Sequence, residues 1–185
     1  VALHLAMLAL DIKKGDEVIV PDFTYIASVN SIAYVGAKPI LVDADIKTWN
    51  INTSLIEERI TDKTKAIMVV HLYGNPCDMG KIKRLCDKYN LFLIEDAAEA
   101  FGSKYKDSYC GSFGDISTFS FFGNKTITTG EGGMVVSSNS DLHEKIKLLK
   151  NQSVSQLKEY WHEQIGFNYR MTNIQSAIGV AQIEK

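Results

Sequence analysis

The sequence predicts an α/β domain in which a mainly parallel β-sheet is flanked by helices. Short apolar segments alternate along the chain with longer segments of helical spacing, a pattern typical of parallel sheets. Two apolar segments, residues 66–70 and 91–94, contain no polar residue, as expected for strands that helices cover on both faces. With 185 residues and 45% hydrophobic content, the chain is large enough to bury one substantial core.

Six segments are expected to form the strands of this sheet. The first follows a turn at Lys14-Gly15-Asp16, and the last two flank a glycine-rich stretch that ends in Gly130-Glu131-Gly132-Gly133. All are short and mostly apolar, which is typical of buried strands. The predicted strands are residues 17–20, 39–42, 66–70, 91–94, 116–122 and 134–136.

Six further segments are expected to form helices. The second ends at Gly36, a typical residue just past a helix, and the fourth and fifth begin at Asp78 and Ser140, which are typical capping residues. Residues 152–164 are polar and are expected to form an irregular loop. The predicted helices are residues 1–10, 26–35, 54–60, 78–89, 140–150 and 172–185.

No linker, repeat or low-complexity tract divides the chain, so one domain over residues 1–185 is expected. Its ends are expected to be cuts within a longer polypeptide. The apolar helix at residues 1–10 lacks an initiator Met and a capping residue, and the helix at residues 172–185 stops without an ending signal. The domain is therefore predicted to be incomplete at both ends.

Charge and cysteine usage narrow the choice of partners and compartment. The 22 acidic and 20 basic residues nearly balance, which gives no electrostatic reason to expect nucleic acid or a membrane surface as partner. The sequence has no apolar run long enough to span a bilayer. Cys77, Cys86 and Cys110 are odd in number and form no C-x-x-C pair, so a reducing, cytoplasmic compartment is expected.

Ligands of an open parallel sheet bind at the carboxyl ends of its strands, so polar residues after each strand are site candidates. The sequence after these strands does not match the familiar phosphate-binding motifs. The sequence has no G-x-G-x-x-G after its early strands, and Gly123-Asn124-Lys125-Thr126 only resembles the end of a P-loop, because Phe119 replaces the leading glycine. The candidates are Asp22, Thr24, Tyr25, Asp43, Asp45, His71, Tyr73, Glu95, Asp96, Gly123, Asn124 and Lys125.

Two pairs among these candidates could carry chemistry. Asp43 and Asp45 could hold a divalent metal, as in nucleotide-sugar glycosyltransferases, although such pairs are common by chance; no His/Cys cluster has zinc spacing. Lys125 and Asp96 could serve pyridoxal phosphate (PLP), which needs a lysine amine for its covalent link and an acid that keeps the pyridine nitrogen protonated. Spacing alone favours a plainer interpretation, a surface lysine and a carboxylate that caps the next helix.

Longer blocks of the sequence resemble the PLP-dependent nucleotide-sugar aminotransferases of the DegT/DnrJ/EryC/StrS type, which have the aspartate-aminotransferase fold. The run at residues 121–130 most resembles the GDP-perosamine synthase branch, which aminates a 4-keto-6-deoxy sugar on GDP. The similar blocks are residues 18–21, 24–25, 35–39, 71–74, 94–102, 111–115, 119–125, 130–134 and 166–170. The resemblance implies that residues 1–185 are the large PLP-binding domain, without the small C-terminal domain.

The resemblance implies a role for five residues. Lys125 would bind the cofactor covalently and then move a proton between substrate and cofactor, and Asp96 would pair with the pyridine nitrogen. Tyr25 matches an aromatic residue that stacks on the cofactor, and Ser120 matches a phosphate-binding hydroxyl. Asn168 matches a residue that reaches the neighbouring subunit's cofactor phosphate, which implies a homodimer with shared sites; as a plain turn residue, Asn168 would need no such role.

Glu99 is also implied to bind the cofactor, although many relatives carry Gln there, near the ring oxygen. A carboxylate at that place must be protonated or turned away from an anionic oxygen. His71 and Tyr73 are expected to be site-wall or dimer-contact residues without a catalytic role.

The resemblance implies amino transfer, with glutamate as donor, to a 4-keto nucleotide sugar. A PLP-dependent enzyme of the same fold that acts on another keto sugar stays open, and so do three other functions. PLP-dependent sugar dehydratases share the fold but carry His where this chain has Lys125; a homologue without turnover would keep only binding; and the Asp43–Asp45 pair would serve a metal-dependent glycosyltransferase.

Overall fold

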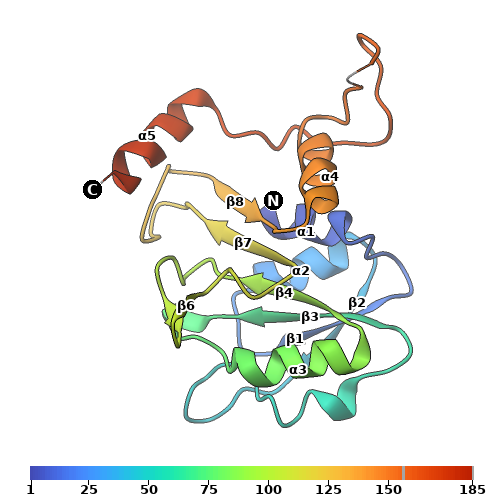
Figure 1. Ribbon diagram of the computed structural model, residues 1–185, viewed down its shortest axis with the longest axis vertical. Helices are drawn as coiled ribbons and strands as arrows, with labels where there is room; N and C mark the ends of the chain where they lie inside the picture. Colours follow the sequence, from blue (N-terminus) through green and yellow to red (C-terminus); the bar gives the residue numbers. More distant parts are fainter. Residues whose placement is uncertain (156, 185) are drawn as a thin grey trace.

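The computed structural model describes residues 1–155 and 157–184 as a layered α/β structure (Figure 1). Within these residues the central sheet has the strand order β2-β1-β3-β4-β7-β8. Neighbours are parallel from β2 to β7, whereas β8 pairs with β7 in the antiparallel sense. The strands are β1 (Glu17–Pro21), β2 (Lys38–Val42), β3 (Thr64–Val70), β4 (Phe92–Asp96), β7 (Ile116–Ser120) and β8 (Gly133–Val136). The predicted mainly parallel sheet is confirmed.

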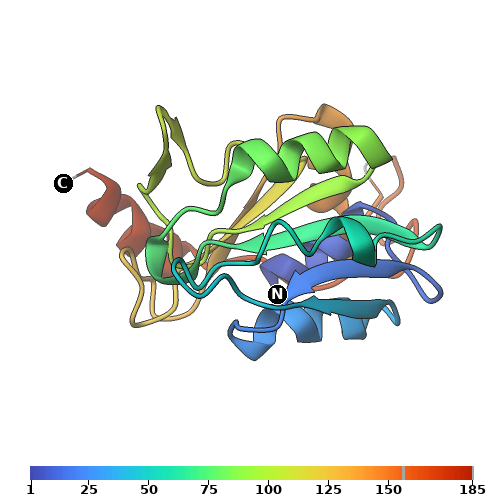
Figure 2. The ribbon, with the colours of Figure 1, turned by 90° about the horizontal axis from the view of Figure 1, so that it is seen from below.

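Helices cover both faces of the sheet, as Figure 2 shows for α3 (Met79–Tyr89) on one side and α1 (Ala2–Ala9) and α2 (Ile26–Tyr34) on the other. Because side chains alternate along a strand, each strand contributes side chains to the cores on both faces of the sheet. On β4, Ile94 packs in the core cluster of α1 and α2, which α4 (Ser140–Lys150) also joins, and Leu93 packs in the cluster of α3. The next two residues, Glu95 and Asp96, therefore point to opposite faces.

Helix α3 begins and ends as its sequence predicts. The Asp78 side chain accepts a hydrogen bond from the Lys81 amide, and Asn90 closes the helix in a left-handed conformation. Its buried residues Met79, Ile82 and Cys86 recur at helical spacing and face the sheet.

Some predicted element ends and one predicted element type are wrong. Asn139, not Ser140, caps α4, because its side-chain oxygen accepts from the amides of Asp141 and Leu142. The helix predicted at residues 54–60 is only a 3₁₀ turn, η1 (Glu57–Arg59). The Asn52 side-chain oxygen accepts hydrogen bonds from the Ser54 amide and hydroxyl, and this local turn competes with a helix. The strand predicted at residues 116–122 ends at Ser120, whose hydroxyl oxygen accepts from the Phe122 amide.

Smaller elements lie near the ends of the parallel strands (Figure 1). A hairpin of β5 (Lys104–Tyr105) and β6 (Ser108–Tyr109), which the sequence analysis missed, projects there. Helix α5 (Asn173–Ile183) begins with a capping box of Thr172 and Gln175, and its Gln182 side chain bonds the backbone of Thr128. The predicted loop at residues 152–164 is irregular where it is described; residue 156 lies outside the described residues, and so does residue 185 of the last predicted helix.

None of the helices in the described part of the chain combines the length and apolar character needed to cross a membrane.

Candidate active site

The central strands end side by side and bring the candidate residues to one edge of the sheet. Asp96, at the end of β4, lies opposite Val70 of β3 and Thr118 of β7. Strand β7 ends two residues later at Ser120, so Ser120 faces the same side of the sheet as Thr118. The loop that follows carries Lys125, whose amide donates to the Phe122 carbonyl in a tight turn.

Asp96 is a buried carboxylate on the α2 side of the sheet. It accepts hydrogen bonds from the Ser28 hydroxyl, at 2.8 Å, and from the Ala98 amide, at 3.2 Å. Burial raises the pKa of Asp96 above its ordinary value, and these two hydrogen bonds and the charge of Lys125 oppose the rise. Within the described parts of the chain Asp96 accepts these two hydrogen bonds, which leave carboxylate lone pairs for a further donor.

Lys125 and Glu99 form an ion pair beside Asp96. The Lys125 Nζ lies 3.6 Å from Glu99 Oε1, and the other Glu99 oxygen accepts from the Tyr73 amide at 2.8 Å. The Lys125 side chain is only 20% exposed. The structure thus brings Asp96, at the end of β4, to the same edge as Glu99 and Lys125, which come from the loops after β4 and β7.

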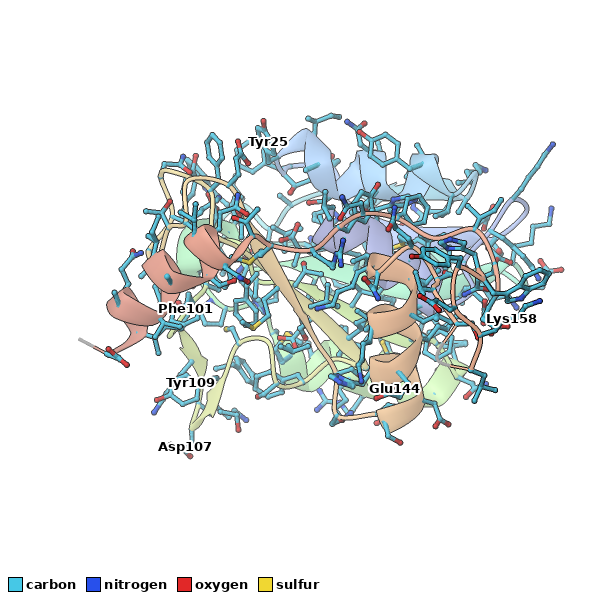
Figure 3. The ribbon with its side chains drawn as sticks, turned by 90° about the horizontal axis from the view of Figure 1, so that it is seen from above. Tyr25, Phe101, Asp107, Tyr109, Glu144 and Lys158 are labelled. Carbon is cyan, nitrogen blue, oxygen red and sulfur yellow. The ribbon has the colours of Figure 1, made fainter. Side chains whose placement is uncertain are left out.

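Tyr25 and Ser120 border this group of charges. Tyr25 precedes the first residue of α2, one turn before Ser28, and Figure 3 shows it at the surface at the start of that helix. Its side chain is among the most exposed aromatics, at 79%. Ser120 is half-buried and lies in register with Gly133 of β8.

Asn168 lies elsewhere in the chain's own structure. It forms an isolated bridge with Asn151, just past the end of α4, and it is exposed. The next residue, Tyr169, donates its amide to the Lys150 carbonyl. Its contacts therefore tie Asn168 to α4 rather than to Lys125 and Asp96.

The expectation that His71 is a site-wall or dimer-contact residue does not fit the structure, which buries His71 completely. Its Nε2 lies 3.0 Å from Glu95 Oε2, and its Nδ1 accepts from the Cys77 amide. Tyr73, in contrast, is exposed and has a positive φ of 50°.

The carboxylates of Asp43 and Asp45 stabilise local turns. Asp43 accepts from the Ala44 amide, and Asp45 accepts from the amides of Lys47 and Thr48. These hydrogen bonds explain both acidic residues as turn formers. Among the described residues, no cluster of three or more His, Cys, Asp or Glu side chains could hold a metal ion.

Two contacts were not predicted from the sequence: the hydrogen bond of Ser28 with Asp96, and the pairing of Glu95 with His71. Ser28 follows Tyr25 by one helical turn, on a helix that must pack against an apolar sheet. Because a buried hydroxyl needs a hydrogen-bond partner, this position could have indicated that Ser28 binds a polar group of the sheet. Glu95 stands in the apolar strand before Asp96, and an acid there likewise needs buried donors.

These residues fit pyridoxal phosphate. The buried Asp96 carboxylate keeps lone pairs to which a protonated ring nitrogen would donate. The charge of that ring would offset the energetic cost of burying the carboxylate. Lys125 places an amine nearby, Tyr25 places an exposed aromatic ring, and Ser120 places a hydroxyl on the face that Asp96 shares. The edge could therefore hold an aromatic, anionic cofactor with a reactive carbonyl.

Known proteins resemble the whole chain. The family model described as the DegT/DnrJ/EryC1/StrS aminotransferase family matches residues 1–185. The GDP-perosamine synthase of Escherichia coli O157:H7 is 64% identical over 185 residues, which cover 100% of this chain and 51% of that protein. The chain thus spans about half the length of the curated relatives it matches.

Solved structures share the fold. The aminotransferase from Psychrobacter cryohalolentis has a TM-score of 0.94 and 44% identity, over 99% of this chain and 49% of that chain. A Streptococcus pneumoniae protein assigned as a sugar aminotransferase, in a PLP-form, has a TM-score of 0.93 and 32% identity, over 99% of this chain and 52% of that chain. These matches confirm the predicted fold class.

Proposed function

Because this chain belongs to the DegT/DnrJ/EryC1/StrS aminotransferase family, we propose that the protein transfers an amino group from glutamate to a 4-keto-6-deoxy sugar carried on GDP. Enzymes of this family depend on pyridoxal phosphate. We assign residues 1–185 to the large cofactor-binding domain of such an enzyme. The 64% identity to a GDP-perosamine synthase supports the choice of a GDP-linked keto sugar over other nucleotide sugars.

Pyridoxal phosphate, when bound, supplies a conjugated ring that stabilises negative charge on the reacting carbon and carries the amino group between donor and acceptor. The chain's residues provide the rest. Asp96 holds a proton on the ring nitrogen, and it is suited to this because its buried carboxylate retains free lone pairs. Ser28 fixes the orientation of that carboxylate from α2.

Lys125 binds the cofactor and moves the proton in each half of the reaction. With the cofactor bound, Nζ would take a proton from the amino-donor carbon and deliver it to the cofactor, and it would carry the proton in the opposite direction with the keto sugar. Glu99, at 3.6 Å from Nζ, orients the amine of Lys125. Lys125 also disfavours the dehydratase alternative, because those enzymes carry His at this position.

Tyr25 and Ser120 position the cofactor. The exposed ring of Tyr25 stacks on the cofactor ring at the start of α2. The Ser120 hydroxyl, at the end of β7, donates to the phosphate.

Asn168 serves the neighbouring subunit in a homodimer with shared sites. Within its own chain Asn168 forms a bridge with Asn151 beside α4, and this position supports a role in trans. We place the enzyme in the cytoplasm, consistent with three free, buried cysteines among the described residues. A GDP-bound amino sugar is an activated glycosyl donor, so the product suits polysaccharide assembly such as lipopolysaccharide O-antigen synthesis.

The observation that carries this proposal is the buried Asp96 carboxylate, with unused lone pairs, beside the charge of Lys125. The test is an amino-transfer assay with the full-length protein, PLP, glutamate and a GDP-linked 4-keto-6-deoxy sugar. We expect 2-oxoglutarate and amino sugar in equal amounts, with UDP- and dTDP-linked keto sugars as controls. Equal or faster amination of a control sugar would contradict the GDP assignment, and absence of PLP-dependent transfer to any sugar would contradict the proposal.

A further inference from the structure

A buried pair, His71 and Glu95, lies directly beneath the candidate site, on the α3 side of β4. Both side chains are fully buried. Among residues 1–155 and 157–184, Glu95 accepts hydrogen bonds from five donors, which come from three segments of the chain. The donors are His71 Nε2, the amides of Gly111, Phe113 and Gly114, and the Ser117 hydroxyl.

The protonation pattern of this pair follows from its hydrogen bonds. The Cys77 amide donates to His71 Nδ1 at 3.1 Å, so the ring proton sits on Nε2. Nε2 then donates to the Glu95 carboxylate at 3.0 Å. Burial raises the pKa of Glu95, but its hydrogen bonds with His71, Gly111 and Gly114 outweigh burial and leave that pKa below its ordinary value. Glu95 is therefore an anion with donors on both oxygens.

His71 begins a tight turn that reaches the site. Tyr73 in this turn has a φ of 50°, a left-handed conformation that a non-glycine residue keeps only when its surroundings hold it. The Gly74 amide donates to the His71 carbonyl, and a Cβ on Gly74 would come within 3.0 Å of the Glu99 carbonyl oxygen. The turn is thus anchored at His71 and packed against Glu99.

The same turn sets the position of the Glu99 carboxylate. The Tyr73 amide donates to Glu99 Oε2 at 2.8 Å, and Glu99 Oε1 lies 3.6 Å from Lys125 Nζ. A continuous chain of contacts therefore runs from Glu95 through His71, the turn and Glu99 to Lys125.

We propose that the His71–Glu95 pair is a positioning device for Lys125, which acts by holding the turn at Tyr73 and through it the Glu99 carboxylate. The functional meaning of this inference rests on the proposed role of Lys125, but the geometry can be tested without the cofactor. Glu95 and His71 are positioning residues, because they act on Lys125 only through Glu99, whose carboxylate forms the ion pair with it.

Two substitutions of His71 separate its hydrogen bonds. His71→Gln places an amide donor near the position of Nε2, so it keeps the bond to Glu95 and loses the acceptor for the Cys77 amide. His71→Asn places an oxygen near Nδ1, so it keeps the Cys77 bond and loses the bond to Glu95. Glu95→Gln leaves His71 intact and removes the anion. Glu99→Gln serves as the reference for direct loss of the charge beside Lys125.

The experiment measures two quantities in the cofactor-free, full-length protein. Hydrogen exchange reports the opening of the Tyr73 amide, and the rate of Lys125 acylation at neutral pH, followed by peptide mass spectrometry, reports how firmly Glu99 holds the amine. We expect His71→Asn and Glu95→Gln to speed Lys125 acylation roughly threefold or more, in the direction of Glu99→Gln, because an amine released from the ion pair with Glu99 is more accessible to the reagent than one held in it. The Tyr73 amide should exchange faster in both, whereas His71→Gln should restore both readouts toward wild type.

Equal effects of His71→Asn and His71→Gln would overturn the proposal, because they would indicate only general damage. It would also fail if Glu99→Gln left Lys125 acylation unchanged, or if Glu99→Gln changed it while the folded His71→Asn did not. If Glu95→Gln does not fold, the two His71 variants decide the question. A separate wild-type titration with PLP tests the proposed function, so failure of cofactor binding is distinguishable from failure of the positioning device.

Discussion

The Ser28 hydroxyl donates a 2.8 Å hydrogen bond to Asp96 Oδ2, across 68 positions of sequence, and ties the first turn of α2 to the end of β4. Asp96 is buried on that side of the sheet, so this bond supplies half of its hydrogen bonds among the described residues. It also fixes the distance in the fold between Tyr25, which precedes α2, and the end of the central strand.

Ser28→Ala should weaken PLP binding and raise the pKa of Asp96 further, because a donor to the charged carboxylate is lost. The expected loss of unfolding free energy is about 1.5–3 kcal/mol, typical of a hydrogen bond to a charged group. Ser31→Ala is the matched control, since Ser31 is buried on the same helix and, in the described part of the chain, its hydroxyl donates only to the Ser28 carbonyl. Urea unfolding and PLP titration check both variants, and equal losses of PLP affinity would count against a special role for Ser28.

Asp96→Asn should make the cofactor-free protein more stable at neutral pH while it lowers turnover about a thousandfold or more. Burial raises the pKa of Asp96, so the folded state holds this proton more tightly than the unfolded state. The stability that Asp96 contributes is therefore present below its ordinary pKa and is lost as pH rises through the raised pKa. Asn removes this loss, so the variant's advantage should grow with pH.

Urea unfolding of the wild type and of Asp96→Asn, from acidic to neutral pH, measures that difference. An advantage that shrinks with rising pH, or a near-normal turnover rate, would remove Asp96 from the proposed role.

Asn168 should act in trans. Mixing a Lys125→Ala chain with an Asn168→Ala chain produces dimers with one intact and one doubly damaged site, if each site takes Lys125 from one subunit and Asn168 from the other. After full exchange, activity should reach about a quarter of the wild-type value, because half of the dimers are mixed. No recovery above either parent, with subunit exchange verified, would argue against shared sites.

Asn139→Ala should cost about 1 kcal/mol of unfolding free energy, because Asn139 caps α4 with two hydrogen bonds. Ser140→Ala, one residue later, should cost about 0.5 kcal/mol or less. Thermal or urea unfolding compares the two, and the reverse order would restore Ser140 as the cap.

The sequence allows prediction of the strands and helices whose signals are local. The apolar runs at residues 66–70 and 91–94, and the cap at Asp78, need no distant partner to be recognised. The cap of α4 was missed because Asn139 and Ser140 are adjacent and both suit the position. The β5–β6 hairpin has only two residues in each strand, too few for a periodic pattern.

The site residues also divide into those with local sequence signals and those whose contacts are made across distant segments. Asp96 and Lys125 could be proposed because Asp96 lies at the end of a recognisable strand and Lys125 lies past the end of another, and the resemblance implied their roles. The partners of the buried polar groups could not, since Ser28, His71 and Glu95 meet across distant segments only after the sheet has formed. Burial of His71 in particular depends on the turn after β3 and on the loop that carries Gly111.

The proposed activity depends on Lys125 above all, and borohydride trapping tests its role most directly. The full-length protein, loaded with PLP and reduced with borohydride, should carry the cofactor on the peptide that contains Lys125, and Lys125→Ala should lose both the adduct and amino transfer. A stable adduct on Lys104 or Lys106 of the β5–β6 hairpin region, or an undiminished adduct in Lys125→Ala, would contradict the assignment.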